Sequence, residues 1–318
     1  MAKILLIGEP LALLVATTEG PLEDVEDFKR KLAGAEVNVA IGLARLGHTV
    51  HFVSKLGNDP YGAYAMKVLE KEGINTDLVT FTDEGFTGSI LKGKVSDGDP
   101  PVAFFCAKSA ATTITPETIE NIDLSEFDFI HITGVFPSIS KTCLNTTKLL
   151  MKKARDIGIP LSFDPNLRPV LWGNHDLMVK ATNELSCLAD IVMPGLAEGK
   201  ILTGFDKPGE IADFYSNLGI PAVIVKLGED GAYIRDNGKS KTVPGFKVDE
   251  VIDTVGAGDG FATGVVSAII EGLAIEEAVV RANAIGAMQI MHISDNEALP
   301  TRPELYGFMN GRQGNGKL

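Results

Sequence analysis

The 318-residue chain is longer than one average domain, and it is 45% hydrophobic and 22% charged, as in soluble globular proteins with a large core. Its formal net charge of −13 argues against nucleic acid and anionic membranes as partners. Its three cysteines, Cys106, Cys143 and Cys187, lie far apart with no Cys-x-x-Cys pair, which argues against a disulfide framework and a zinc site and predicts a cytoplasmic location.

The chain begins with the apolar run ILLI at 4–7, which GEP at 8–10 interrupts too early for a signal peptide. We therefore expect a buried first strand. Further apolar, β-branched runs predict strands at 50–53, 129–133, 159–163, 191–193 and 222–227. Helical patterns lie between them at 36–46, 61–72, 141–156, 176–188 and 209–217. This alternation predicts an α/β fold with a mostly parallel sheet that is covered on both faces.

Two segments, 11–32 and 86–106, break the alternation because they read as extended chain without a helix between paired strands. In the second, extended stretches at 87–95 and 102–106 flank a turn-rich loop at 96–101. We expect a small β appendage that acts as a lid and excludes water from a reaction site. A structural hairpin or the edge of a homodimer is the alternative. One domain is expected over 1–310, with a flexible tail at 311–318.

The stretch GAEVNVAIGLARLG at 34–47 reads as an amphipathic helix closed by a glycine. Asn38 lies in its first turn and interrupts an otherwise helix-forming sequence. A capped surface helix would explain the pattern by itself. Together with the motif at 253–260 described below, a sugar contact by Gly34 and Asn38 is the better interpretation.

Polar residues follow the predicted strand at 159–163, in the sequence DPNLR at 164–168. The carboxyl edge of an open α/β sheet is where such folds bind ligands. Arg168 is a natural counter-charge for an anionic substrate, although a surface ion pair would also account for it.

The sequence DTVGAGDG at 253–260 follows an extended, β-rich segment at 241–251 and precedes an apolar, small-residue run at 261–273, so it predicts a strand, a turn and a helix start. Glycines in the turn let a ligand approach the backbone, where unpaired N–H groups attract an anion. Asp259 adds the carboxylate that a phosphoryl-transfer site needs to accept the proton of the attacking hydroxyl. We expect Asp259 to be the general base and residues 256–259, with Gly256, Ala257 and Gly258, to form the anion hole. A simple N-cap is the alternative.

The two motifs at 33–47 and 253–261 together resemble those of ribokinase-like carbohydrate kinases of the phosphofructokinase-B type, and the resemblance extends from about residue 3 to 305. It implies a three-layer αβα sandwich with a small β-strand lid, and ATP- and Mg²⁺-dependent phosphorylation of a sugar hydroxyl. It also implies nucleotide contacts by Asn166, by Lys226, Gly228 and Gly231 in a turn, and by Asn283 on a helix. A tight hairpin would explain the glycines of that turn equally well.

The metal segment departs from the family pattern. Relatives often have Asn-x-x-Glu after a strand, whereas this chain keeps Glu198 but has Gly195 in place of the asparagine. We expect Glu198 to order water around Mg²⁺, and Asp253 to contact a monovalent cation such as K⁺. No P-loop and no Gly-x-Gly-x-x-Gly after the first strand is present, so dinucleotide chemistry is not supported.

The substrate is predicted from smaller features. No acidic residue follows Glu9 closely, and this resembles the 2-keto-3-deoxygluconate kinases of the family more than fructokinases and ribokinases. Those sugar-acid kinases usually carry a Tyr-Arg pair where this chain has Phe105 and Cys106; Lys108 would then hold the carboxylate. We expect 2-dehydro-3-deoxygluconate as acceptor. A ketose such as fructose comes second, followed by a nucleoside kinase and a non-catalytic sugar sensor.

Overall fold

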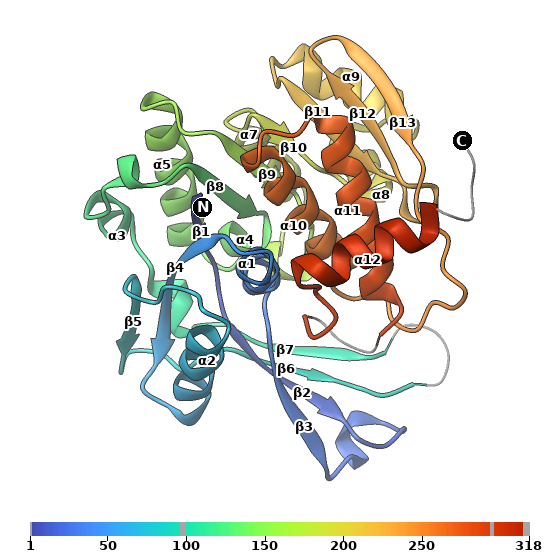
Figure 1. The fold of residues 1–318 in the computed structure, drawn as a ribbon. Coiled ribbons are helices and arrows are strands. Elements are labelled where there is room, and N and C mark those ends of the chain that lie inside the picture. The colour runs from blue at the N-terminus through green and yellow to red at the C-terminus, as the bar shows by residue number, and fades with distance from the viewer. Residues whose placement is uncertain (1, 96–99, 293–295, 314–318) are drawn as a thin grey trace.

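A computed structural model describes residues 2–95, 100–292 and 296–313 (Figure 1). Its centre is a nine-stranded sheet with the order β13-β12-β11-β10-β9-β8-β1-β4-β5. Neighbouring strands from β11 to β5 are parallel, whereas β12 is antiparallel to both of its neighbours. The strands are β1 (Lys3–Ile7), β4 (Thr49–Gly57), β5 (Val79–Thr82), β8 (Phe129–Thr133), β9 (Leu161–Asp164), β10 (Ile191–Val192), β11 (Ala222–Lys226), β12 (Ala232–Asp236) and β13 (Lys239–Val243).

Helices cover both faces of this sheet (Figure 1). One face carries α1 (Ala35–Arg45), α2 (Pro60–Lys71), α10 (Ala257–Ile270), α11 (Ile275–Ile290) and α12 (Arg302–Gln313). The other carries α3 (Pro116–Glu120), α4 (Val135–Ser138), α5 (Lys141–Asp156), α6 (Pro169–Trp172), α7 (His175–Ser186), α8 (Leu196–Thr203) and α9 (Pro208–Asn217). The α/β fold expected from the sequence is therefore confirmed.

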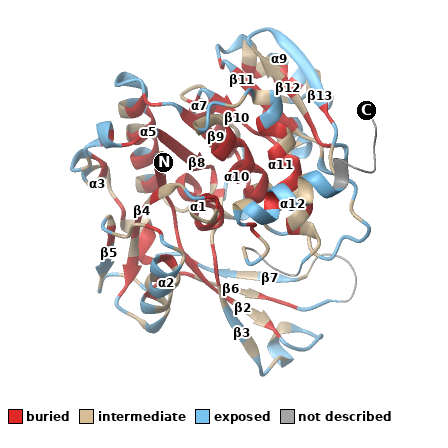
Figure 2. Cartoon of the chain, viewed as in Figure 1, coloured by how far each residue is buried: buried red, intermediate tan, exposed pale blue. Residues whose placement is uncertain are grey.

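The central strands are apolar on both sides because each face packs against helices. In β1, Ile4 and Leu6 belong to one core cluster, whereas Leu5 and Ile7 belong to the other. The central strands β1 and β8 and the helices α1, α10 and α11 accordingly carry many buried residues in Figure 2. This leaves the strand ends as the places where polar residues of the sheet can meet a ligand.

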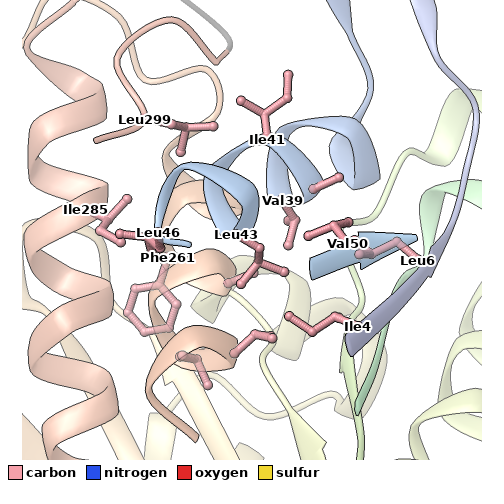
Figure 3. Close-up of a cluster of buried hydrophobic side chains, with 14 of the residues drawn as sticks. Ile4, Leu6, Val39, Ile41, Leu43, Leu46, Val50, Phe261, Ile285 and Leu299 are labelled. Atoms are coloured by element: carbon pink, nitrogen blue, oxygen red, sulfur yellow. The ribbon is translucent and has the colours of Figure 1, made fainter. Parts of the chain in front are cut away.

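Close helix packing places the two sequence motifs side by side. A Cβ atom at Gly42 of α1 would lie 2.6 Å from Cγ2 of Thr263 in α10, and one at Gly264 would lie 2.4 Å from Cα of Ala282 in α11. Small residues thus bring these three helices together, and α1 and α10 share one apolar cluster that includes Leu43 and Phe261 (Figure 3).

The segments that break the alternation form a second, four-stranded sheet with the order β3-β2-β6-β7, which extends from the edge of the main body (Figure 1). Its strands are β2 (Leu11–Ala16), β3 (Phe28–Ala33), β6 (Ser89–Lys92) and β7 (Val102–Phe105). The β2–β3 and β6–β7 pairs are antiparallel, and β2 and β6 are parallel. Residues 96–99 of the turn-rich loop lie outside the described residues.

The structure differs from the sequence expectations at two places. The extended segment expected at 241–251 is a strand only to Val243, because Pro244 lacks the N–H group that would continue the ladder. The tail expected at 311–318 overlaps α12, which continues to Gln313, since Arg and Gln are good helix formers. Residues 314–318 lie outside the described part of the chain.

Candidate active site

The turn at 253–260 ends in the first turn of α10. Its N-cap, Gly256, adopts a left-handed conformation with φ of 79°, which glycine accepts at little cost. The first helical N–H groups have no partner within a helix. The N–H of Ala257 donates to the Thr254 carbonyl at 3.3 Å, and that of Gly260 to the Gly256 carbonyl at 2.8 Å. The N–H groups of Gly258 and Asp259 therefore remain as the best candidates for holding an anion.

Asp259 is buried in this first turn, with 8% of the residue exposed. Its two carboxylate oxygens accept hydrogen bonds from Asn38 Nδ2 at 2.7 Å and from Asn166 Nδ2 at 3.0 Å. Burial raises its pKa to about 7, the Asn38 hydrogen bond opposes that rise, and nearby Asp164 adds to it. A buried carboxyl group with a pKa near neutrality can exchange protons at neutral pH.

Asn38 is held in place from its other side. Its Oδ1 accepts from Asn296 Nδ2 at 3.0 Å, and the same amide donates to the Leu32 carbonyl at 2.8 Å. Gly34, the N-cap of α1, has φ of 135°, and a Cβ atom there would lie 2.6 Å from the Glu9 carbonyl oxygen. The start of α1 is therefore fixed against the loop that follows β1.

Asp164 ends β9 and faces Lys226, which ends β11. Lys226 Nζ lies 2.8 and 2.7 Å from the two Asp164 carboxylate oxygens, and Asp164 is 1% exposed. Burial alone would lower the pKa of Lys226, but the carboxylates of Asp164 and Glu198 beside it outweigh that effect and raise it. This pair places a positive charge next to the anion-holding turn, since a Cβ atom at Gly258 would lie 3.8 Å from Lys226 Nζ.

Glu198 and Arg168 lie at the same edge of the sheet. The Glu198 carboxylate accepts from the Leu167 N–H and the Gly195 N–H, both at 2.7 Å. Arg168 is exposed, and its Nη1 donates to the Leu167 carbonyl at 2.9 Å. Its charge also lowers the pKa values of Asp259 and Glu36, so it lies near both carboxyl groups. At the carboxyl edge of the large sheet, the structure thus brings together six of the predicted site residues: Asp259, Asn38, Asn166, Lys226, Glu198 and Arg168.

Other residues expected in the site lie apart from this group of contacts. Gly228 and Gly231 lie in the short turn that joins the antiparallel strands β11 and β12. This is the tight hairpin that the sequence analysis gave as the alternative explanation for these glycines. Asn283 of α11 donates to the Pro244 carbonyl at 3.0 Å, beyond the end of β13. Phe105 of β7 is 50% exposed, and Lys108 follows it in an exposed loop with φ of 64°. None of these residues is among the hydrogen-bond partners of the Asp259 carboxylate, which are Asn38 and Asn166.

Two buried glutamates were not predicted as site residues. Glu36 of α1 accepts from Thr133 Oγ1 at 2.6 Å, and burial raises its pKa to about 7. Glu9, which follows β1, is 5% exposed; burial and the charge of Glu36 raise its pKa to about 8. Among the described residues, Oε1 of Glu9 and Oε2 of Glu36 have no hydrogen-bond partner. Nothing in the sequence around Glu9 or Glu36 signalled their burial, because burial depends on the tertiary fold.

Replacing Glu9 by Gln should stabilise the protein at slightly alkaline pH and have little effect near pH 4. The pKa of Glu9 is raised above its ordinary value, from 4.5 to about 8, so the folded state binds the extra proton and stability falls as pH rises between those values. The neutral amide removes that dependence, and since each pKa unit corresponds to about 1.4 kcal/mol, the gain is on the order of a few kcal/mol. Thermal unfolding across pH measures it. Glu120→Gln, at an exposed position, is the control, and an equal effect of both substitutions would contradict the assignment.

Asp253 lies just before the anion-holding turn. Its Oδ2 forms an ion pair of 2.8 Å with Lys92 Nζ from β6, and its Oδ1 accepts from the Val255 N–H at 3.0 Å. The sequence had suggested Asp253 as a contact for a monovalent cation. Lys92 was not predicted in the site, because nothing in its local sequence distinguishes it from a surface lysine.

Two hollows in the surface lie elsewhere, one lined in part by Arg155, Gly158 and Asp190, the other by Ile122, Lys153 and Asp156. The described residues contain no cluster of three or more His, Cys, Asp or Glu side chains arranged for a metal, and no helix among them is long and apolar enough to cross a membrane. The hydrogen-bonded group around Asp259 therefore defines the candidate active site.

Comparison with known proteins now assigns the family. Residues 1–302 match the family model described as pfkB family carbohydrate kinase. The chain belongs to the pfkB family of carbohydrate kinases. It is 43% identical to 2-dehydro-3-deoxygluconokinase from Bacillus subtilis (strain 168), over 96% of this chain and 95% of that protein. It is 31% identical to probable fructokinase-4 from Arabidopsis thaliana, over 97% of each.

Solved structures of pfkB-family and related kinases share the fold. The PfkB protein from Polaromonas sp. JS666 is 44% identical with a TM-score of 0.88, covering 96% of this chain and 99% of that one. Two relatives at 25% identity, each covering at least 97% of both chains, were solved with ligands. One is a putative ribokinase II from E. coli with ATP and Mg²⁺ (TM-score 0.89), and the other a double mutant of fructokinase from Vibrio cholerae O395 with fructose, ADP and potassium ion (TM-score 0.85). The expected ribokinase-like fold and sugar-kinase class are confirmed.

Proposed function

We propose that this pfkB-family kinase transfers the γ-phosphoryl group of ATP to a hydroxyl group of a sugar acid, with 2-dehydro-3-deoxygluconate as its preferred acceptor. The observation that carries the proposal is the buried Asp259 carboxylate at the start of α10, held by Asn38 and Asn166 and with a pKa of about 7. A general base works best when its pKa lies near the operating pH.

In the proposed reaction, Asp259 accepts the proton of the acceptor hydroxyl. The oxygen then attacks the γ-phosphorus in line, the bond to the β-phosphate oxygen breaks, and ADP leaves. The turn formed by Gly256, Ala257, Gly258 and Asp259 offers N–H groups to the charge on the transferred phosphoryl group. Lys226 lies beside this turn and adds a positive charge. Gly34 and Asn38 position the acceptor from the start of α1.

The nucleotide is proposed to lie along the ends of β9 and β11. Asn166, Lys226, Gly228 and Gly231 come from these ends, and Asn283 comes from α11. The two glycines have φ of 64° and 89°. These conformations turn the main chain sharply. At Gly228 no atom lies within 4 Å of where a Cβ atom would be, which leaves room for a phosphate or a base, whereas at Gly231 the Val243 carbonyl oxygen fills that space.

Mg²⁺ fits this site as an ion held through water and nucleotide phosphates. The Glu198 carboxylate uses two acceptor positions on the Leu167 and Gly195 N–H groups, and a carboxylate has about four. Glu198 would therefore hold metal-bound water, in keeping with the absence of a carboxylate cluster among the described residues. When bound, Mg²⁺ neutralises charge on the β- and γ-phosphates.

The choice of a sugar acid rests on the relative with 43% identity and on Arg168. Its Nη1 donates to main-chain carbonyls at the strand edge, and a guanidinium has further N–H donors that suit a carboxylate. Lys108, and Phe105 in the small sheet, would reach the acceptor when that sheet acts as a lid over the strand edge. A neutral ketose is the second candidate, favoured by the match to fructokinases.

A coupled assay of ADP release over sugar acids, ketoses and nucleosides tests the proposal. We expect the highest kcat/KM with 2-dehydro-3-deoxygluconate and a lower value with its non-acidic analogues. Fastest turnover with fructose would replace the proposal with a ketose kinase. Binding of a sugar without ADP release from any acceptor would replace it with a non-catalytic sensor.

Replacing Asn38 by Ala should move the acidic limb of the kcat/KM profile to higher pH. Asn38 stabilises the ionised form of Asp259, so its removal raises the pKa of that group further above 7. A hydrogen bond to a charged group is worth about 1.5–3 kcal/mol, which corresponds to roughly 1–2 pH units. Asn121→Ala, at an exposed asparagine, should leave the profile unchanged. An unshifted limb in the Asn38 variant would show that another group controls the rate.

We also propose, from the composition and the family, a cytoplasmic protein that forms a homodimer through the small sheet. Support for the dimer comes from β7, an edge strand on which Val102, Phe104 and Phe105 are exposed. Sedimentation analysis of the wild type and of a Phe104→Ser variant measures it, with a monomeric wild type contradicting the dimer.

A further inference from the structure

Lys92 and Asp253 join the small sheet to the turn that precedes Asp259. Lys92 lies at the end of β6 and is 7% exposed, and its Nζ contacts Asp253 Oδ2 at 2.8 Å. The other oxygen of Asp253 accepts from the Val255 N–H, which directly precedes the N-cap of α10. The Asp253 N–H itself donates to the Ile290 carbonyl of α11 at 3.3 Å. Asp253 therefore connects the Lys92 ammonium group to the main chain of the anion-holding turn.

A buried lysine needs a specific partner, because removing an ammonium group and a carboxylate from water is unfavourable. The attraction between the two charges offsets this desolvation free energy only when their geometry is good. Such a pair is weak support for stability, so its position suggests another use. Here it neutralises a carboxylate next to a turn whose N–H groups must face an anion. An unneutralised Asp253 would repel that anion.

A potassium ion does not fit the same carboxylate in this chain. The ion would need oxygen ligands, and the Lys92 ammonium group lies 2.8 Å from Oδ2 of Asp253, where a cation would bind, while Oδ1 accepts from the Val255 N–H at 3.0 Å. A second cation against the same carboxylate would also be repelled by the Lys92 ammonium. This differs from the expectation for Asp253 drawn from the sequence.

We propose that the ammonium group of Lys92 takes the place of a monovalent cation beside Asp253, and that this kinase therefore turns over without added potassium. Lys92 is a positioning residue: it neutralises Asp253 and holds the main chain at 253–256 so that the α10 N–H groups face the phosphoryl group. It supplies this charge from the small sheet, so closure of that sheet and assembly of the anion-holding turn are coupled. The proposal rests on the kinase function proposed above.

The first experiment titrates K⁺ against the wild-type enzyme at constant ionic strength, with choline as the replacement ion. We expect the same kcat with and without K⁺. A fall of about 10-fold or more on removing K⁺ overturns the proposal. Lack of ADP release under every ionic condition contradicts the kinase function itself, so the two failures are distinguishable.

The second experiment uses Lys92→Met, which keeps an unbranched side chain, one atom shorter, but removes its charge. Since a misplacement of about 1 Å in a catalytic group can cost roughly 100-fold, we expect kcat to fall by about 10- to 100-fold without K⁺ and the KM for the acceptor to change less. K⁺ or NH₄⁺ should restore part of the lost kcat. Adding Asp253→Asn to this variant should abolish that rescue, because the carboxylate that attracts the ion is gone.

Lys94→Ala is the matched control, because Lys94 follows β6 and is exposed, with a contact of 3.4 Å to the Thr17 carbonyl. It should keep wild-type turnover with no response to K⁺. A Lys92→Met enzyme that turns over like the wild type, or whose defect is indifferent to K⁺ and NH₄⁺, overturns the proposal. Circular dichroism verifies that the variant is folded, and if it is not, the wild-type K⁺ titration still decides.

Discussion

Replacing Asp259 by Asn should lower kcat by about 10²- to 10⁴-fold and leave the KM values for ATP and the acceptor near those of the wild type. A general base acts mainly in the transition state, so its removal appears in kcat, and general bases contribute about this factor. Asp259 is buried, and the amide N–H donors of Asn38 and Asn166 hold its two oxygens at the start of α10. Single-turnover and steady-state measurements with the preferred acceptor check the result.

The substitution also introduces a conflict between hydrogen-bond donors, whose effect on folding must be separated from the loss of catalysis. Asn at 259 would direct its own N–H₂ group at one of two amides that donate to Asp259 now, and Asn38 cannot turn its amide without losing its contact with Asn296. The melting temperature and ATP binding of the variant show whether the fold is intact. Asp176→Asn, at a fully exposed position on α7, is the matched control and should be neutral. Turnover within about 3-fold of the wild type in Asp259→Asn would exclude this group as the base.

The parts of the site that sequence reasoning located share one property: each follows a recognisable strand or opens a recognisable helix. Asn166 lies after an apolar strand and Asn38 in the first turn of an amphipathic helix, and parallel topology brings both to the carboxyl edge of one sheet. Their convergence on Asp259, from positions 93 and 221 residues away, follows from that topology.

The parts that sequence reasoning missed depend on which distant side chains face each other. Lys92 and Asp253 are 161 residues apart, and Lys92 stands in a strand whose neighbours are unremarkable. Asp164 lies in a motif, but its partner Lys226 is 62 residues further along the chain. Because periodicity reports which face of an element is apolar and not what a polar side chain meets, such ion pairs become visible only in the fold.

The end of β13 is set by a proline, which the hydrophobic pattern of the sequence did not reveal. The run at 222–227 predicted β11 closely, whereas β13 ends at Val243 because Pro244 follows it, and the segment from there to the turn is not a strand. As a result, the turn at 253–260 is held by Lys92 and by the carbonyl of Ile290 instead of by a sheet. The position of this turn therefore depends on these few contacts and not on a neighbouring strand.

Replacing Lys226 by Met should destabilise the protein by about 3–5 kcal/mol at neutral pH. The Asp164 carboxylate, 1% exposed, would lose the ammonium group that lies within 2.8 Å of both of its oxygens, and an uncompensated buried charge costs about this much. In thermal unfolding the loss corresponds to a fall of roughly 5–10 °C. ATP binding should weaken as well if Lys226 faces the phosphates.

Three further measurements assign the loss to the unpaired carboxylate. Adding Asp164→Asn should recover much of the stability, because Asn keeps the acceptor for the Asn166 N–H without the charge. The penalty of Lys226→Met should shrink as pH falls, since an unpaired Asp164 has a raised pKa and the proton it takes up favours the folded state. Lys148→Met, which breaks an exposed pair with Glu184, should cost less than about 1 kcal/mol. A Lys226→Met variant no less stable than Lys148→Met would show that Asp164 is already neutral in the folded protein, and the charge beside the anion-holding turn would then have to be reassigned.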